Sequence, residues 1–418
     1  MAASGPVSAT TLPVATAAHT AAARKSDRDL VAGGLRIFSS TMPATDGSKL
    51  ALTALETAVR GGSVPREMAL RLDLLRSLGA RAAWQRRQAQ RELATLGDEP
   101  WNAVYLRIWS EAAAALDASV QNLGYGFLEL RRGSSATRVW RQYTELDGPV
   151  ALRLALDRRV VSALLRQADI PTPDSMELDP LNPDAGIPFL AGGPCVVKPA
   201  SGTGVGSGVT SGVTSRTQLR RALLRAAQYG GAVLERQIPG TVYRLLYLDG
   251  QLLDVVRKLP PTVVGDGRST IASLVDAENR HRINARGSAG LALLKLDHDA
   301  LFTLRAAGLG PRSVPASGVR VTVKSVTNQN RNEDSETVPR SAIDDRLVAE
   351  CAAAVEAVGL RLSGVDIVTR DLGAPLRDSG GAVIDVNGMP GLNHHYHVAE
   401  PTHAVPVAVT ILEALLRG

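Results

Sequence analysis

The sequence contains little cysteine and few aromatic residues. Aromatic residues make up 4% of the 418 positions, and the two cysteines, Cys195 and Cys351, lie far apart in apolar surroundings. This pattern argues against a disulfide scaffold or a zinc site and fits a reducing compartment. No apolar stretch approaches the ~18 to 20 residues of a membrane span, and residues 1–20 lack the features of a signal peptide. These absences predict a cytoplasmic protein with two core cysteines.

The charge balance does not indicate nucleic-acid binding. The 47 basic and 41 acidic residues give a net charge of +6, which favours anionic ligands without demanding a polyanion. The densest basic stretch, 81–91, lacks repeated aromatic residues, so a solvated helix face is the better interpretation. We expect small-molecule or peptide substrates and no nucleic-acid or membrane partner, and we leave a homo-oligomer open.

Local patterns divide the chain into a tail and two folded parts. Residues 1–29 are rich in Ala, Ser and Thr without periodicity, which predicts a flexible tail. The following part, 30–149, is expected to form a smaller α/β domain, and 150–418 a larger domain, with a boundary near Pro149. The smaller domain has helical patterns at 68–78 and 104–116 and strand-like runs at 119–123, 127–131 and 137–140.

The larger part mixes strand-like and helical segments. Expected strands are 194–198, 231–235, 243–248, 251–257, 319–323, 364–369 and 381–386, and expected helices are 152–168, 218–228, 271–279, 346–358 and 403–416. This mixture predicts the α+β class.

A glycine-rich segment follows the strand expected at 194–198. Lys198 stands at the end of that strand, and Gly202, Gly204, Gly206 and Gly208 come soon after it. Glycines let a backbone approach a triphosphate and turn its N–H groups toward it, and a lysine adds a point charge. The segment lacks the Gly-Lys-Ser/Thr ending of a Walker A loop, and taken alone it fits a flexible linker equally well.

Side chains suited to a metal ion lie near the C-terminus. Asp366 lies in an apolar strand-like run, and Asp385 and Asn387 share one face of a second run because side chains alternate along a strand. Oxygen ligands of this kind suit Mg²⁺ that also binds nucleotide phosphates, with Mn²⁺ as an alternative metal. Together with Lys198, these residues predict a site for ATP and a metal ion.

Longer motifs form an ordered set. They are VLERQIPG at 233–240, RKLPPTVVGDGRSTIASLVDAEN at 257–279, KLD at 295–297, SVPASG at 313–318 and DVNGMPG at 385–391. In sequence and order they resemble the ATP-grasp domain of cyanophycin synthetase and of the fused glutathione synthetases. The resemblance extends from roughly Ala118 to the C-terminus, which is about 300 residues and fits one catalytic unit with part of the domain before it.

This resemblance implies an ATP-grasp fold, in which two α+β subdomains hold ATP and a lid at about 190–242 carries Lys198 and the glycines. It also implies individual roles. Glu235 matches an acidic residue beside the adenine-binding hinge, Arg244 and Arg257 match basic residues near the reacting carboxylate and phosphate, and Asp366, Asp385 and Asn387 match magnesium ligands. Lys198, Arg244 and Arg257 are therefore the catalytic candidates.

Several positions depart from the family pattern. Asp385 stands where glutamate is usual, Val242 replaces an acid that holds the ribose, and Arg158 replaces a lysine among the nucleotide-binding positions. An Asn-rich stretch, 328–335, replaces a glycine-rich substrate loop, and 401–403 replaces a usual Gly and Arg. We therefore expect redistributed nucleotide contacts and a diverged acceptor site.

A histidine cluster lies close to the metal candidates. The spacing of His394, His395 and His397 matches no standard zinc motif, so a role in a substrate pocket or at the surface is favoured over metal binding. Asn328 and His394 are the substrate-binding candidates.

Together these features predict an ATP-dependent carboxylate–amine ligase that forms an amide or peptide bond through an acyl phosphate, on amino acid or peptide substrates. Two alternatives stay open. One is a nucleotide-binding module without turnover, motivated by Val242, Arg158 and Asp385, and the other is a kinase that phosphorylates its acceptor. The Mur-ligase-like half of cyanophycin synthetase is not recognised, so we expect that the chain is not a complete synthetase of that polymer.

Overall fold

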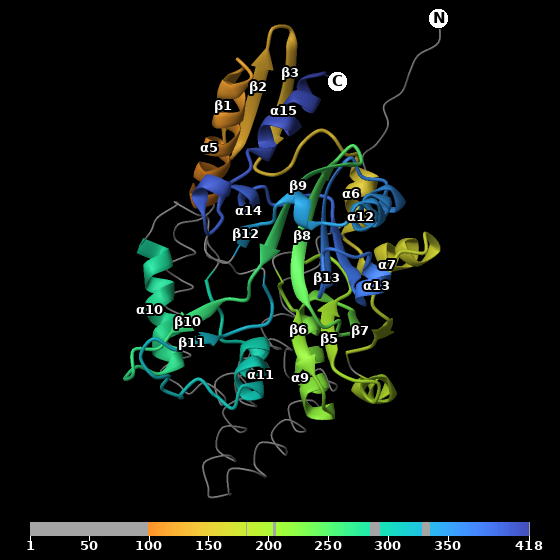
Figure 1. The fold of residues 1–418 in the computed structure, drawn as a ribbon, viewed down its shortest axis with the longest axis vertical. Coiled ribbons are helices and arrows are strands. Elements are labelled where there is room, and N and C mark those ends of the chain that lie inside the picture. The colour runs from red at the N-terminus through yellow and green to blue at the C-terminus, as the bar shows by residue number, and fades with distance from the viewer. Residues whose placement is uncertain (1–98, 181, 204–205, 285–292, 328–334, 418) are drawn as a thin grey trace, which may run out of the picture. The chain divides into compact units, whose positions relative to one another are not determined.

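The computed structural model describes residues 99–417, except 181, 204–205, 285–292 and 328–334 (Figure 1). The predictions for the tail at 1–29, the helix at 68–78 and the basic stretch at 81–91 lie outside the described residues. All described residues belong to one compact unit. Within these residues, no helix has the length and apolar character needed to cross a membrane.

The described chain begins with one long helix and a small antiparallel sheet, as the sequence predicts. The elements are α5 (Glu99–Ala115), β1 (Ser119–Gly124), β2 (Phe127–Arg132) and β3 (Ser135–Trp140). Tyr105, Trp109 and Ala112 of α5 are buried at helical spacing, and they share a hydrophobic cluster with Ile411 and Leu412 of the C-terminal helix α15 (Val407–Arg417). Figure 1 shows α15 beside this sheet. This region therefore completes its core with the far end of the chain.

A five-stranded antiparallel sheet forms the centre of the larger part. Its strand order is β12 (Ser335–Thr337), β9 (Gln251–Lys258), β8 (Thr241–Leu248), β13 (Leu362–Thr369) and β14 (Ala382–Asn387). One face packs Leu245, Tyr247 and Val365 in a cluster that also contains Leu347 of α12 (Asp345–Val358). The other face is divided. Leu246 and its apolar neighbours join the cluster of α5 and α15, and the opposite end of this face carries charged side chains.

The helix expected over 152–168 is interrupted, so that prediction is corrected. The chain forms α6 (Pro149–Ala155) and α7 (Arg158–Gln167), separated by Leu156 and Asp157. Asp157 has extended backbone angles, and its side chain accepts a hydrogen bond from the Arg159 N–H, which is the geometry of a helix N-cap. The capping aspartate thus starts a second helix within one hydrophobic pattern.

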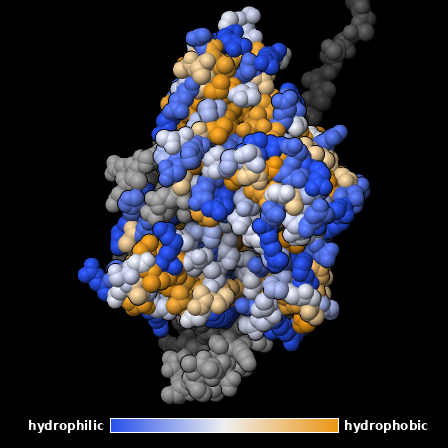
Figure 2. All heavy atoms as spheres, viewed as in Figure 1, coloured by the Kyte–Doolittle hydropathy of each residue, from blue (hydrophilic) through white to orange (hydrophobic). Residues whose placement is uncertain are grey.

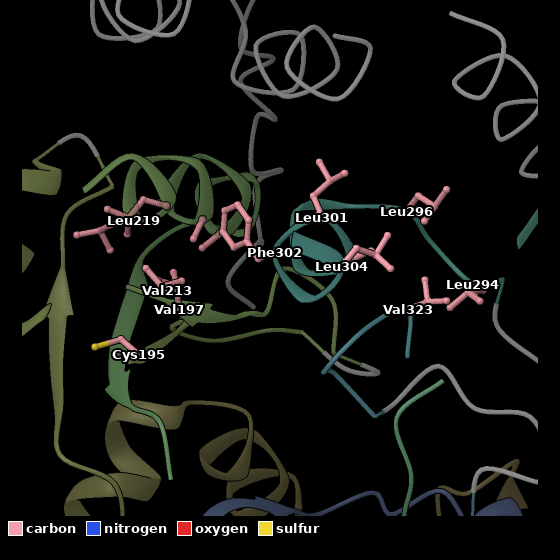
Figure 3. Close-up of a cluster of buried hydrophobic side chains, with 14 of the residues drawn as sticks. Cys195, Val197, Val213, Leu219, Leu294, Leu296, Leu301, Phe302, Leu304 and Val323 are labelled. Carbon is pink, nitrogen blue, oxygen red and sulfur yellow. The ribbon is translucent and has the colours of Figure 1, made fainter. Parts of the chain in front are cut away.

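A four-stranded antiparallel sheet forms the second layer. Its order is β4 (Ser175–Leu178), β7 (Ala232–Arg236), β5 (Cys195–Pro199) and β6 (Thr210–Val213), and α9 (Arg216–Ala226) packs on it. The same hydrophobic cluster includes residues of β10 (Thr262–Val264), α10 (Ile271–Asn284), α11 (His298–Ala306) and β11 (Arg320–Thr322). In Figure 3 the ring of Phe302 on α11 lies toward α9. The segment after β9 therefore shares its core with the four-stranded sheet.

Short elements complete the described chain. They are α8 (Ile187–Leu190), α13 (Leu376–Ser379), α14 (Asn393–Tyr396) and 3-10 turns at Pro183–Gly186, Ala227–Tyr229, Arg340–Ala342 and Pro401–His403. The last helix begins at Val407, four residues after the position expected from the sequence. Figure 2 shows a mixed face, with hydrophobic residues near the top, where Figure 1 draws β1–β3 and α15, and again lower on the face. The antiparallel sheets and their covering helices confirm the α+β class, and both cysteines are buried as expected.

Candidate functional site

A cleft of about 630 Å³ is lined by residues of both larger sheets. It brings together most of the candidates that the sequence singles out. Those that line it are Arg158, Lys198, Gly206, Glu235, Arg244, Asp366, Asp385, Asn387 and His394, together with Val242. These residues come from β5, β7, β8, β13, β14 and the segments next to them. A strong concentration of charge therefore lies between two apolar cores.

A buried ion pair occupies the four-stranded side of the cleft. Lys198 Nζ lies 2.6 Å from Glu235 Oε2 and donates a hydrogen bond to the Ile384 carbonyl at 3.2 Å. Strand alternation explains this arrangement, because Val197 and Leu234 enter the core while Lys198 and Glu235 face the cleft. Since Ile384 belongs to β14, Lys198 also connects the two sides.

The predicted glycines differ in what they do. Gly206 lines the cleft, whereas Gly202 and Gly208 do not, and Gly204 lies outside the described residues. Gly208 has a φ of +77°, and a Cβ there would lie 2.5 Å from Pro199 Cγ. Tight packing of the segment against β5 therefore requires glycine at this position, independently of any ligand.

Charged residues of the five-stranded side form a hydrogen-bonded network. Arg244 binds Asp366 in a bidentate pair, with Nε–Oδ1 at 2.8 Å and Nη2–Oδ2 at 2.6 Å, and both residues are about 95% buried, with 5% and 4% of their surface exposed. Asn387 Nδ2 donates to Asp366 Oδ2 at 3.3 Å and to the Gly364 carbonyl at 3.0 Å. Burial alone would raise the pKa of Asp366, but the charges of Arg244 and Lys258 outweigh it and hold that pKa below its usual value.

The predicted metal ligands lie together on paired strands. Asp366 is directly opposite Asp385 in the β13–β14 register, and Asn387 follows on the same face of β14. The Asp385 side chain is 24% exposed, and its Oδ2 lies 3.7 Å from Arg158 Nη2, so it presents oxygen atoms to the cleft. Within the described ranges, no group of three or more His, Cys, Asp or Glu residues is arranged to hold a metal ion. Two carboxylates and an amide do suit a hard cation that takes its remaining ligands from water and phosphate.

Arg158 connects the start of α7 to the glycine-rich segment. Its Nη1 donates to the Pro199 carbonyl at 3.0 Å and to Thr203 Oγ1 at 3.2 Å. Its guanidinium therefore lies between the two sides of the cleft, close to Asp385. Val242 lines the same cleft and presents no acid there.

The structure does not bring Arg257 to the cleft. On β9 it lies on the face opposite to that of Lys258, and it is paired with Glu336 near the surface. The neighbouring Lys258 is the buried cation, with Nζ 4.0 Å from Asp366 Oδ1. Burial, with a further contribution from Arg244, lowers the pKa of Lys258 to about 7. Strand alternation could have identified Lys258 in the sequence, because Lys258 pairs with Val242 and lies on the same face of the sheet as Arg244.

The three histidines have separate surroundings. His394 lines the cleft, and burial together with Lys258 and Arg244 holds its pKa well below the usual value. His395 is fully buried, with Nδ1 2.6 Å from Asp254 Oδ2 on β9. His397 Nε2 lies 2.8 Å from Arg107 Nη2, which donates to it. They therefore do not converge on one point, and the other substrate candidate, Asn328, lies outside the described residues.

The N-terminal elements supply cleft residues that the sequence did not indicate. Trp101 and Tyr105 of α5, with Arg141 and Gln142 after β3, line the end of the cleft near α14. The Tyr105 hydroxyl donates to Asn393 Oδ1 at 3.2 Å. Because these contacts join segments almost 290 positions apart, no local pattern could reveal them.

The fold and site define an α+β protein with a charged cleft between two antiparallel sheets. Its sequence relatives include the cyanophycin synthetase of Trichormus variabilis, 28% identical over 294 residues, which are 69% of this chain and 32% of the relative. Another relative is the glutathione biosynthesis bifunctional protein of Desulfotalea psychrophila, 26% identical over 263 residues, 61% of this chain and 33% of that one. These similarities confirm the resemblance that the motifs predict. This chain spans about a third of the length of these curated relatives.

No protein-family model matches the sequence. Among solved structures, a bifunctional glutathione synthetase from Pasteurella multocida aligns with a TM-score of 0.46 and 22% identity, covering 72% of this chain and 41% of that one.

Proposed function

We propose that this protein is an ATP-dependent ligase of the ATP-grasp type, which joins a carboxylate to an amine as an amide. The observation that carries the proposal is the cleft itself. Lys198 and Glu235 face Arg244, Asp366, Asp385 and Asn387 across it, within a chain related to cyanophycin synthetases and to glutathione biosynthesis proteins. Amino acids or peptides are the proposed substrates, and Lys198 and Arg244 the proposed catalytic residues.

ATP would lie between the two sheets. Lys198 and Arg158 supply positive charge for its phosphates, and Gly206 lets the backbone come close to them. Glu235 is the penultimate residue of β7, and the connection from β7 to β8 passes very close to β13. At Gly240 in this connection, a Cβ would lie 2.5 Å from the Thr369 carbonyl oxygen. We assign the adenine to this edge of the cleft, where Val242 replaces a polar ribose contact by an apolar one.

Asp366, Asp385 and Asn387 would hold Mg²⁺, or Mn²⁺ in its place. The bound cation would neutralise charge on the phosphate oxygens. Asp385 is more accessible than Asp366, both of whose oxygens accept hydrogen bonds from Arg244. Arg244 therefore fixes the orientation of Asp366 on the five-stranded side of the cleft.

The proposed reaction has two steps, phosphoryl transfer to the carboxylate and then amide formation. In the first, an oxygen of the donor carboxylate attacks the γ-phosphorus of ATP, the bond to the bridging oxygen breaks, and ADP leaves with its electron pair. Lys198, Arg158 and Arg244 stabilise the charge on the transferring oxygens. In the second, the amine nitrogen attacks the acyl carbon, the carbon–oxygen bond to phosphate breaks, and inorganic phosphate leaves. The amine also loses a proton.

The chain provides a neutral acceptor for that proton. His394 lines the cleft near Arg244 and Lys258, which together with burial keep its imidazole uncharged near pH 7. An uncharged imidazole can accept a proton from the attacking amine, whereas an imidazolium cannot. We therefore assign His394 to the amine side, along with Trp101, Tyr105 and Arg141.

The test is product analysis with a panel of amino acids and dipeptides, in the presence of MgATP. A ligase releases ADP and inorganic phosphate in equal amounts with a new amide, and only when both a carboxylate and an amine are present. A stable phosphorylated acceptor would instead indicate the kinase alternative. Nucleotide binding without ADP release across the panel would indicate a module without turnover. Either result would contradict the proposed reaction.

A further inference from the structure

A single buried carboxylate outside the proposed catalytic set connects two segments of the cleft. Asp299, in the first turn of α11, is fully buried. Its Oδ1 accepts hydrogen bonds from the Ser211 N–H at 3.0 Å and the Ser211 hydroxyl at 2.6 Å. Its Oδ2 accepts from the N–H groups of Ser325 at 3.2 Å and Val326 at 3.1 Å. Both oxygens are thus saturated by donors.

All three of its partners line the cleft. Ser211 lies on β6, just beyond the glycine-rich segment, and Ser325 and Val326 follow β11. These segments are far apart in the sequence and belong to no common sheet. The Asp299 carboxylate joins them, because it accepts hydrogen bonds from both segments.

Thr303 and the core packing of α11 also fix the position of Asp299. Thr303 Oγ1 donates to the Asp299 carbonyl at 2.8 Å and accepts from the Ser325 N–H at 3.1 Å. Leu301, Phe302 and Leu304 anchor α11 in the hydrophobic cluster that includes α9 and β5 (Figure 3). The packed core therefore sets the position of Asp299, and the hydrogen bonds of its carboxylate connect this core to the cleft.

We propose that Asp299 is a positioning residue for nucleotide binding: by holding Ser211 and the 325–326 segment at a fixed separation, it sets the shape of the cleft beside the glycine-rich segment. This inference rests on the proposed function, because the proposed function assigns the nucleotide to that cleft. A carboxylate can hold both segments because its two oxygens only accept hydrogen bonds. An amide in its place would turn an N–H₂ group toward backbone or hydroxyl donors and push one segment away.

The control is Asp147, a partly buried carboxylate whose two oxygens also accept hydrogen bonds from backbone N–H groups. Its Oδ1 accepts from the Arg361 N–H at 2.7 Å and its Oδ2 from the Leu362 N–H at 3.2 Å, and none of these residues lines the cleft. Asp147→Asn therefore disturbs hydrogen bonds to one backbone segment, 361–362, outside the proposed site, whereas Asp299→Asn disturbs two segments at the site. Comparing the two variants separates a loss of stability from a loss of cleft geometry.

The experiment is calorimetric titration of the full chain with the magnesium complex of a non-hydrolysable ATP analogue, alongside melting temperatures. We expect both variants to melt below the parent, but only Asp299→Asn to bind about tenfold more weakly, since it leaves buried donors unsatisfied at the site. Asp147→Asn should stay within about twofold of the parent. Equal affinities in the two variants would overturn the inference.

A milder variant keeps the test decisive if Asp299→Asn does not fold. Ser211→Ala removes only the hydroxyl donor, and we expect it to fold and to weaken analogue binding about threefold. Unchanged affinity in Ser211→Ala would count against Asp299 acting through β6. If the parent itself does not bind the analogue, the proposed function fails and the inference fails with it, which is a different result from a parent that binds and variants that bind equally.

Discussion

The two sides of the cleft are built differently. On the five-stranded side, Arg244 and Asp366 lie opposite each other on adjacent central strands, so the sheet register itself places the charges. On the four-stranded side, the Lys198–Glu235 pair lies near strand ends, and the remaining contacts come from loops. Arg158 and Asp299 connect those loops to neighbouring elements. One side is therefore preorganised by regular structure, and the other depends on a few long-range hydrogen bonds.

This difference affects how each side should respond to mutation. Removing one member of a buried charge pair leaves the other charge without compensation, which costs more than the pair contributes. Loop contacts that line the cleft allow water to replace a lost partner, except at the fully buried Asp299. We therefore expect substitutions in the two buried pairs, Arg244–Asp366 and Lys198–Glu235, to cost more stability than substitutions in the loop contacts, and ligand affinity to depend on both sides.

The largest expected effect is that of Asp366→Ala. It leaves Arg244 buried without its bidentate partner, so we expect a loss of about 3 to 5 kcal/mol in the free energy of unfolding, together with loss of ligation. Denaturant titration measures the first and ADP release the second. The control is Asp249→Ala, whose partner Arg361 is about half exposed, and this surface pair should contribute less than about 1 kcal/mol. Similar losses in both variants would contradict the comparison.

The second effect separates activity from stability on the four-stranded side. Lys198→Ala removes the proposed phosphate-binding charge, and we expect turnover to fall by at least about a hundredfold. The substitution also leaves the buried Glu235 without its charged partner, so the melting temperature should fall. It should then recover in the Lys198→Ala/Glu235→Ala double variant. Turnover should remain low in the double variant. Full activity in either variant, at a melting temperature close to that of the parent, would remove Lys198 from the mechanism.

A smaller effect is expected at Asp385, where the accessible carboxylate meets the proposed cation. Asp385→Glu keeps the charge and lengthens the side chain, so we expect turnover within about threefold of the parent, whereas Asp385→Ala should raise the magnesium concentration needed for half-maximal rate by about tenfold. Rates measured across a magnesium titration decide this. If the alanine variant has the same magnesium dependence as the parent, Asp385 is not a ligand.

The smallest effect concerns pH and Lys258. Because burial lowers the pKa of Lys258 to about 7 in the folded protein, the unfolded chain holds this proton between about pH 7 and 10 where the folded chain does not. Charged Lys258 therefore opposes folding below pH 7, and this cost disappears as pH rises toward 10. We expect Lys258→Met to melt above the parent at pH 6.5 and the advantage to shrink by pH 9.5. An advantage that does not change with pH would show that the Lys258 pKa is not lowered.

The sequence predicted elements with strong local signals and missed those defined by tertiary contacts. The strands β8, β9, β13 and β14 were expected within two residues of their observed bounds, and α5, expected over 104–116, begins five residues earlier. β10 and β12, each of three residues, are too short to carry a periodic pattern, and α11 was not recognised. The interruption between α6 and α7 was missed because both helices contribute to one apolar face, although Asp157 was an available capping signal.

Prediction of the site residues was limited in the same way, by contacts between distant parts of the chain. Motifs predicted the residues on β5, β7, β13 and β14 that line the cleft, because each motif lies on one strand or at its end. Arg257, which the sequence singles out, is one position from the buried Lys258, and on a strand one position reverses the face. Tyr105 and Asp299 gave no local signal, since their importance comes from partners elsewhere in the chain.

The most direct test of the central claim is an oxygen-isotope experiment on the reaction itself. A carboxylate donor found in the substrate panel would be labelled with ¹⁸O in both oxygens and incubated with MgATP, the amine and the protein. An acyl phosphate intermediate requires one labelled oxygen to move from the carboxylate to inorganic phosphate for each amide formed, because the carbon–oxygen bond breaks in the second step. We predict phosphate that carries one ¹⁸O atom, detected by mass spectrometry. Unlabelled phosphate formed along with the amide would contradict the account.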